Sequence, residues 1–222
     1  MENLLISQKI RIDKYGQLLD NLERNYTIYF NSLNFNLYPI SNYILNIDNY
    51  LDGIKYNGLV LSGGGDINPD FIVADNKKQY QYYYQREKIE NKLIRRMIDE
   101  GLPILGICRG MQKLNAYFGG KITGDIFNDI NDRTPGKEHF VEFKKKIFDL
   151  KGKYKVNNYH NHGIKSKQVA DDFDIFTIDN KYDVIERIIH KNLPIIGIHC
   201  HKKKKKINLE LNKILITKFF KN

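Results

Sequence analysis

Residues 102–112 read LPILGICRGMQ, and this stretch decides the fold. Its first half, residues 103–107, is a short continuous apolar run, which is typical of a strand buried on both faces of a parallel sheet. Residues 109–118 have the pattern of a helix, and two glycines end it. A single residue, Cys108, separates the two elements. The stretch therefore predicts a strand, a tight corner and a helix in immediate succession.

The corner residue has the setting of a catalytic nucleophile. Such a turn pushes Cys108 out of the carboxyl edge of the sheet, in the geometry of a nucleophile elbow. Gly106 and Gly110 flank it, and their small size lets the strand and helix approach closely. The helix N-terminus favours the thiolate, which is the nucleophilic form. Most free cysteines are only small buried hydrophobes, but a cysteine between two glycines at such a junction favours the catalytic interpretation.

A second strand is followed by a glycine run. The apolar segment at residues 57–61 stops at SGGGDINP, residues 62–69. Such a run can present backbone N–H groups to a substrate oxygen, with the N–H of Arg109 as a second donor. An oxyanion hole of this kind is worth roughly 3–4 kcal/mol per donor. A simple turn or a phosphate loop is the alternative, although no Lys–Ser/Thr pair of the Walker type follows.

A third feature is GIHCH at residues 197–201. It lies at the end of another apolar strand, which is expected at residues 194–199. Strand alternation puts His199 and His201 on one face and Cys200 on the other. Thiol attack needs a base within hydrogen-bonding reach, and His201 would stand at the same sheet edge as Cys108. Taken alone, His201 would be a surface histidine beside a lysine run.

The remaining pattern supports an α/β fold. Alternation of strands and helices predicts an open, mostly parallel sheet with helices on both faces and a small antiparallel ribbon. Residues 1–222 are expected to form a single domain. Expected strands lie at residues 4–6, 27–30, 57–61, 103–107, 173–177, 183–189 and 194–199, expected helices at 82–100, 109–118 and 207–220, and the ribbon at 140–154.

Composition narrows the class of protein. The chain of 222 residues has 41% hydrophobic residues, no apolar run long enough for a membrane helix and no signal-peptide pattern. Two cysteines make no disulfide framework. We expect a soluble, cytoplasmic protein without a cofactor or metal. The net charge of +10 fits either a compositional bias towards lysine or an anionic substrate. No motif indicates nucleic acid or membrane binding, and the oligomeric state is not predicted.

Two longer segments resemble a known family. LPILGICRGMQKLNAYFGGKI at residues 102–122 and VNNYHNHGI at residues 156–164 are similar to the class I glutamine amidotransferase-like superfamily. The nearest branch is that of the γ-glutamyl hydrolases, of the γ-glutamyl-GABA hydrolase type. The resemblance covers most of the chain from Gly58 onward and preserves the order of glycine loop, elbow cysteine and late histidine. It implies a flavodoxin-like sheet.

The resemblance also implies an acyl-enzyme mechanism. Cys108 would attack the γ-carbonyl, while the backbone N–H groups of Gly64 and Arg109 would hold the oxyanion. His201 would accept the thiol proton and pass it to the leaving nitrogen, and water would then release glutamate. The residues that line the glutamyl pocket would be Gln112, Tyr159 and His160.

One departure from the family affects the base. The family follows its catalytic histidine with Pro and then Glu, but here a run of five lysines occupies residues 202–206. Lys203 cannot accept the imidazole N–H, and its charge would lower the histidine pKa. Three interpretations follow: a Cys–His dyad, a replacement carboxylate at Glu210 or Glu186, or an impaired enzyme.

The leaving group has several candidates. Without a separate synthetase domain, a hydrolase that releases a whole amine is favoured over an amidotransferase. Within the resembling branch, the opening ISQKI at residues 6–10 and the basic balance look like γ-glutamyl-CDP-amidate hydrolases, which serve capsular polysaccharide phosphoramidate synthesis. Lysines would attract a diphosphate group. The alternatives are a γ-glutamyl-GABA-type hydrolase, a glutaminase subunit of an amidotransferase, and a non-catalytic pseudo-hydrolase.

Overall fold

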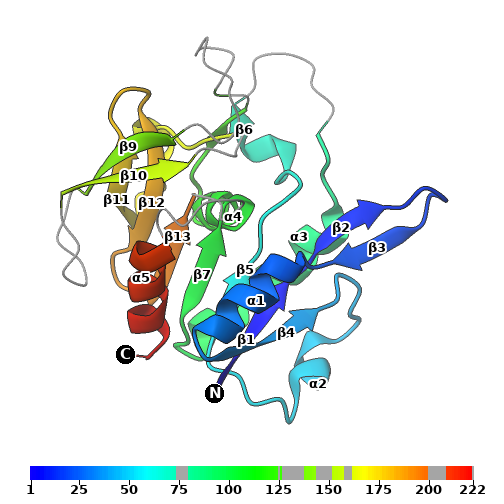
Figure 1. Cartoon of the computed structure of the whole chain (residues 1–222). Coiled ribbons are helices and arrows are strands. Elements are labelled where there is room, and N and C mark those ends of the chain that lie inside the picture. Colours follow the sequence, from blue (N-terminus) through cyan, green and yellow to red (C-terminus); the bar gives the residue numbers. More distant parts are fainter. Residues whose placement is uncertain are drawn as a thin grey trace.

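The structure is a computed structural model that describes residues 1–73, 80–124, 126, 138–143, 152–157, 162–199 and 209–221. Within these residues, a sheet of nine strands forms the centre, in the order β10-β9-β11-β12-β13-β7-β5-β1-β4 (Figure 1). Its parallel part contains β4 (Phe35–Ile40), β1 (Glu2–Ser7), β5 (Leu59–Leu61), β7 (Ile104–Ile107) and β13 (Ile195–Ile198). Its antiparallel part adds β12 (Val184–His190), β11 (Phe173–Asp179), β9 (Glu138–Phe143) and β10 (Lys153–Asn157).

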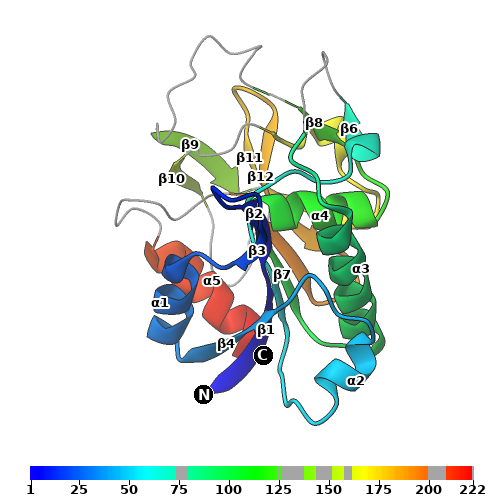
Figure 2. The same ribbon diagram turned by 90° about the vertical axis from the view of Figure 1, so that its right-hand side faces the viewer.

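Helices cover both faces of the sheet, as Figure 2 shows. One face packs against α1 (Arg24–Ser32) and α5 (Leu209–Lys221), and the other against α2 (Ile47–Leu51), α3 (Tyr84–Asp99) and α4 (Arg109–Tyr117). Strand alternation produces the two cores. In β1, Leu4 and Ile6 join the α1–α5 core, whereas Leu5 between them joins the α3–α4 core. The expected α/β fold with helices on both faces is confirmed.

Smaller elements lie at the carboxyl edge of the parallel strands. An antiparallel hairpin of β2 (Lys9–Ile12) and β3 (Leu18–Asn21) projects beyond the end of β1 (Figure 1). The short strands β6 (Ile72–Val73) and β8 (Ile122–Thr123) pair in parallel. Short 3₁₀ turns occupy Pro69–Phe71 and Ser166–Gln168. No helix among the described segments is long and apolar enough to cross a membrane.

One expected element is wrong. The β-prone residues 27–30 were expected to form a strand, but they lie within helix α1. Tyr26, Tyr29, Phe30 and Leu33 recur at helical spacing, and all four pack into the α1–α5 core. Burial of that apolar stripe outweighs the local preference of Thr and Ile for strands.

The other expected elements agree with the structure, with shifted ends. The helix expected at residues 82–100 is α3, and Gly101 after it adopts the positive φ of 67° that a helix C-terminus favours. The ribbon expected at residues 140–154 appears as the β9–β10 pair, which extends the main sheet through β11. Strand β4, helix α2 and the β2–β3 hairpin were not anticipated from the sequence.

Candidate functional site

Cys108 stands at the corner between strand β7 and helix α4. Its backbone has φ 53° and ψ −107°, a left-handed conformation that is uncommon for a residue other than glycine. Its N–H donates to the carbonyl of Ile198 at 2.7 Å, which ties the corner to the end of β13. The side chain is largely buried, with 9% of its surface exposed. Backbone strain of this kind is concentrated at functional sites.

Two glycines allow the corner to form. A Cβ atom on Gly106 would lie 2.6 Å from the backbone of Gly110, and one on Gly110 would lie 2.1 Å from the carbonyl oxygen of Leu61. Real Cβ atoms do not approach backbone so closely, so both positions require glycine. Helix α4 consequently starts against the carboxyl ends of β5 and β7. The glycine loop, residues 62–66, begins directly after that contact at Leu61.

The glycine loop is anchored at its backbone N–H groups. Gly64 and Gly65 have φ angles of 86° and 72°, which glycine adopts without strain. The N–H of Ser62 donates to Ser7 Oγ at 3.0 Å, and the N–H of Gly63 donates to the Tyr26 hydroxyl at 2.9 Å. The loop is thus held by residues from β1 and α1, far away in sequence.

The loop carbonyls are held from helix α3 and helix α4. Arg86 donates to the carbonyl oxygens of Ser62 at 2.7 Å and Gly64 at 2.6 Å. Arg109 donates through Nε to the carbonyl oxygen of Asp66 at 3.2 Å. Two guanidinium groups therefore bind three carbonyls of one short loop.

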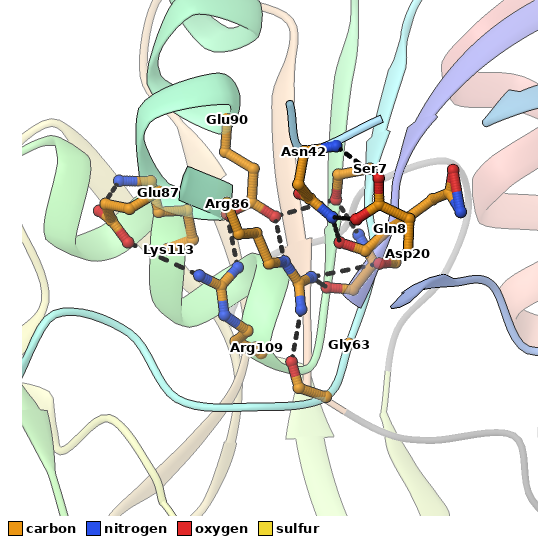
Figure 3. Close-up of polar contacts among 12 residues, drawn as sticks. Ser7, Gln8, Asp20, Asn42, Gly63, Arg86, Glu87, Glu90, Arg109 and Lys113 are labelled. Atoms are coloured by element: carbon orange, nitrogen blue, oxygen red, sulfur yellow. Dashed lines mark hydrogen bonds and ion pairs between the residues drawn. The ribbon is translucent and has the colours of Figure 1, made fainter. Parts of the chain in front are cut away.

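These arginines belong to a buried charge cluster, drawn in Figure 3. Its members are less than 10% exposed and are Arg86, Glu87, Glu90, Arg109 and Lys113. Glu90 Oε1 lies 2.9 Å from Arg86 Nε and accepts a hydrogen bond from the Ser7 hydroxyl, while Glu90 Oε2 lies 2.5 Å from an Arg109 nitrogen. Lys113 pairs with Glu87.

The charges of the cluster keep Glu90 ionised, and Arg86 also keeps its charge. Burial alone would raise the pKa of Glu90, but the charges of Arg109 and Arg86 outweigh it and lower that pKa to about 2. Burial and repulsion from Arg109 lower the pKa of Arg86 to about 10, against the attraction of Glu90. Both groups are therefore charged at neutral pH.

Tyr26 lies within electrostatic reach of Cys108. Burial raises the pKa of its phenol, the hydrogen bond from Gly63 lowers it, and the negative charge of a Cys108 thiolate raises it again. The phenol is consequently protonated at neutral pH. It accepts the Gly63 N–H and keeps its own proton to donate.

Gln112 connects two polar groups beside the corner. Its Nε2 donates to the carbonyl of His162 at 3.2 Å and lies 3.0 Å from Nε2 of His199. His162 in turn pairs with Asp66 of the glycine loop, Nε2 to Oδ1 at 2.9 Å.

The structure locates only part of the expected site. Cys108, Gly64, Arg109 and Gln112 come from β7, the glycine loop and α4, which meet at one sheet edge. The other expected residues lie outside the described residues, and these are Tyr159, His160, His201 and Lys203, with Cys200 beside them. Of the two carboxylates considered as replacements, Glu186 is buried on β12, where its carbonyl accepts the N–H of His199 at 2.8 Å, and Glu210 belongs to helix α5.

Sequence reasoning missed the polar residues that surround this edge, among them Tyr26, Arg86, Glu90 and His162. A signal existed for two of them. Arg86 and Glu90 continue, at helical spacing, the buried stripe that Leu93 and Met97 form on α3. Charged residues on a buried stripe are rare unless paired, so this position pointed to a buried ion pair.

Comparisons with known proteins agree with this architecture. The family model described as Peptidase C26 matches residues 36–203. A γ-glutamyl-CDP-amidate hydrolase of Campylobacter jejuni is 30% identical over 168 residues, which cover 76% of this chain and 71% of that protein. A candidate glutamine amidotransferase-like protein of Lactococcus lactis, YvdE, is 33% identical over 131 residues, so the chain spans little more than half of that relative (55%).

Solved structures share the fold. A candidate GMP synthase component from Thermoplasma acidophilum superimposes with a TM-score of 0.65 at 21% identity, covering 100% of this chain and 96% of that chain. A glutamine amidotransferase from Thermotoga maritima gives a TM-score of 0.59 at 18% identity, covering 90% and 75% of the two chains.

Proposed function

The chain belongs to the peptidase C26 family, whose members are hydrolases of amide bonds, and from that premise we propose that it cleaves γ-glutamyl amides with Cys108 as nucleophile. The observation that carries the proposal is the left-handed backbone of Cys108 at the β7–α4 corner. That corner makes Cys108 the N-cap residue of helix α4, and the positive end of the helix dipole there favours a thiolate. The glycine loop follows the neighbouring strand β5, and Ser7 and Tyr26 hold its backbone. Its Gly64 N–H would stabilise the oxyanion of an acyl transfer.

The proposed reaction runs through a thioester. The Cys108 sulfur forms a bond to the γ-carbonyl carbon, and the carbonyl electron pair moves to the oxygen. The backbone N–H groups of Gly64 and Arg109 stabilise this oxyanion. His201 accepts the thiol proton and donates it to the amine as the C–N bond breaks. Water then attacks the thioester, which releases glutamate and restores the thiol.

We favour γ-glutamyl-CDP-amidate as the substrate. The relative of that name supports it at 30% identity, and the net charge of +10 suits a diphosphate leaving group. The products would be glutamate and cytidine diphosphoramidate, a precursor for phosphoramidate groups on capsular polysaccharide. The same nucleophile, base and oxyanion donors would cleave γ-glutamyl-GABA or glutamine if the pocket for the leaving group fitted one of those amines instead.

Glutamate release tests this proposal. The purified chain is mixed separately with γ-glutamyl-CDP-amidate, γ-glutamyl-GABA and glutamine, with Cys108→Ala as the inactive control. Release from the first substrate alone, abolished in the variant, is the expected result. Release from γ-glutamyl-GABA alone would replace the substrate, and release from glutamine alone would favour a glutaminase subunit.

The experiment also includes the variant Lys203→Glu, which restores the glutamate that the family has at this position. A misplaced catalytic histidine costs on the order of 10⁴ in kcat in triad enzymes. If the wild-type chain releases no glutamate from any substrate and Lys203→Glu restores release, the chain is an impaired hydrolase. If neither protein is active, the chain is a pseudo-hydrolase and the proposed catalysis is wrong.

A further inference from the structure

We propose that Arg86 is a positioning residue for the oxyanion hole: its guanidinium fixes the direction of the Gly64 N–H without touching the substrate. This inference rests on the proposed function, because it concerns the same site. It assigns a role in the reaction to a residue on α3, an element that contributes none of the expected catalytic groups.

The peptide planes of the loop carry the argument. In a trans peptide the C=O and N–H point in opposite directions. The plane between Ser62 and Gly63 is therefore held at both ends, by Arg86 at the carbonyl (2.7 Å) and by Tyr26 at the N–H (2.9 Å). The plane after Gly64 is held at its carbonyl by the same Arg86 (2.6 Å).

The Gly64 N–H belongs to the one peptide plane between these two. Glycines with positive φ have many accessible conformations, so the loop sequence alone does not set the direction of that N–H. Contacts from Arg86 on the planes before and after Gly64 remove this freedom. A donor held in advance contributes more to a transition state than one that must be oriented during the reaction.

Glu90 joins the loop to the nucleophile corner. Its two oxygens bind Arg86 at 2.9 Å and Arg109 at 2.5 Å, and Oε1 also accepts from Ser7, which anchors the Ser62 N–H. Arg109 is the residue directly after Cys108, and its backbone N–H is the second expected donor. One buried carboxylate thus connects the segments that carry both donors.

The geometry of Arg86 can be separated from its charge. Lysine at position 86 keeps the positive charge but cannot bind two carbonyls and a carboxylate in the planar, forked manner of a guanidinium. We therefore expect Arg86→Lys to lower kcat by about 10²–10³-fold, the effect of losing one oxyanion donor. KM should stay within about twofold, because Arg86 does not contact the substrate.

Arg95 offers a matched control on the same helix. It forms an ion pair with Asp99 at 2.9 Å, with the i,i+4 spacing of Arg86 and Glu90, but its side chain is 72% exposed. Arg95→Lys should leave kcat and KM unchanged. Wild-type kcat in Arg86→Lys would overturn the proposal, since charge alone would then suffice.

A second readout needs no substrate. Hydrogen exchange, followed by mass spectrometry, reports on the loop peptide that contains the anchored amides of Ser62 and Gly63. We expect that peptide to exchange at least about tenfold faster in Arg86→Lys, and the β7 peptide to keep its wild-type rate. Unchanged loop exchange overturns the positioning role even if the chain releases no glutamate from any substrate.

Ser7→Ala covers the case in which Arg86→Lys fails to fold. It removes only the hydroxyl between Ser62 N–H and Glu90. We expect a fall in kcat of about tenfold at unchanged KM, together with faster exchange of the loop peptide. Wild-type kinetics and wild-type exchange in Ser7→Ala would contradict the inference independently of Arg86.

Discussion

Replacing Gly110 by alanine should lower kcat strongly while it lowers the free energy of unfolding only modestly. The new Cβ would lie 2.1 Å from the Leu61 carbonyl oxygen, whereas a carbon and a carbonyl oxygen in contact are about 3.3 Å apart. Helix α4 must therefore retreat from strand β5 by about 1 Å. That movement carries Arg109 and the corner at Cys108 away from the glycine loop.

The magnitude follows from two opposing effects. Overpacking a core costs about 1–3 kcal/mol, while alanine gains about 0.5–1 kcal/mol over glycine in a helix. We expect a net loss of about 1–2 kcal/mol in the free energy of unfolding. A displacement of about 1 Å at reacting groups can lower kcat about 10²-fold.

Gly119→Ala, at the other end of helix α4, is the matched control. Its Cβ would meet nothing within 4 Å, but its φ of 89° disfavours alanine by about 1–2 kcal/mol. Urea unfolding and steady-state kinetics should show similar stability losses and a loss of kcat in Gly110→Ala only. Equal kcat values in the two variants would refute the argument that close packing of α4 on β5 positions the site.

Two further predictions concern single side chains. Tyr26→Phe removes the acceptor of the Gly63 N–H and should lower kcat by about fivefold at unchanged KM in glutamate-release kinetics, because one hydrogen bond is worth about 1 kcal/mol net. Tyr50→Phe, at an exposed position, should have no effect. His190 Nδ1 accepts two backbone N–H groups of the following turn at 3.0 Å, and burial lowers its pKa. The unfolded chain then binds a proton at His190 more readily than the folded chain does. The contribution of His190 to the free energy of unfolding is therefore present above a pH of about 6.5 and is lost as the pH falls through and below that value. Urea unfolding across this range should show that loss in the wild type and a smaller one in His190→Asn, whereas equal pH profiles would contradict it.

Several features of this protein were determined by local sequence. Continuous apolar runs identified β5, β7 and β13, and helical spacing identified α3 and α5, because the period of burial follows directly from strand and helix geometry. The corner at Cys108 was predictable for the same reason, since this single residue separates a buried strand from a helix.

Local preference failed where packing outweighed it. Residues 27–30 are β-prone but fold as part of α1, since Tyr26, Phe30 and Leu33 share a stripe that only a helix can bury. The strand β4 lies next to β1, and its membership of the sheet depends on that pairing rather than on its own sequence. Interactions between distant segments decided both cases.

The environment of the glycine loop was decided by the tertiary structure alone. Ser7, Tyr26 and Arg86 are 55, 37 and 22 positions from the nearest loop residue that each contacts. A parallel sheet brings the carboxyl ends of its strands to one edge, so residues far apart in the chain meet there. The sequence by itself specified the strand–corner–helix turn at Cys108 and a glycine-rich loop, and packing of α1 and α3 against the sheet determined which side chains hold that loop in place.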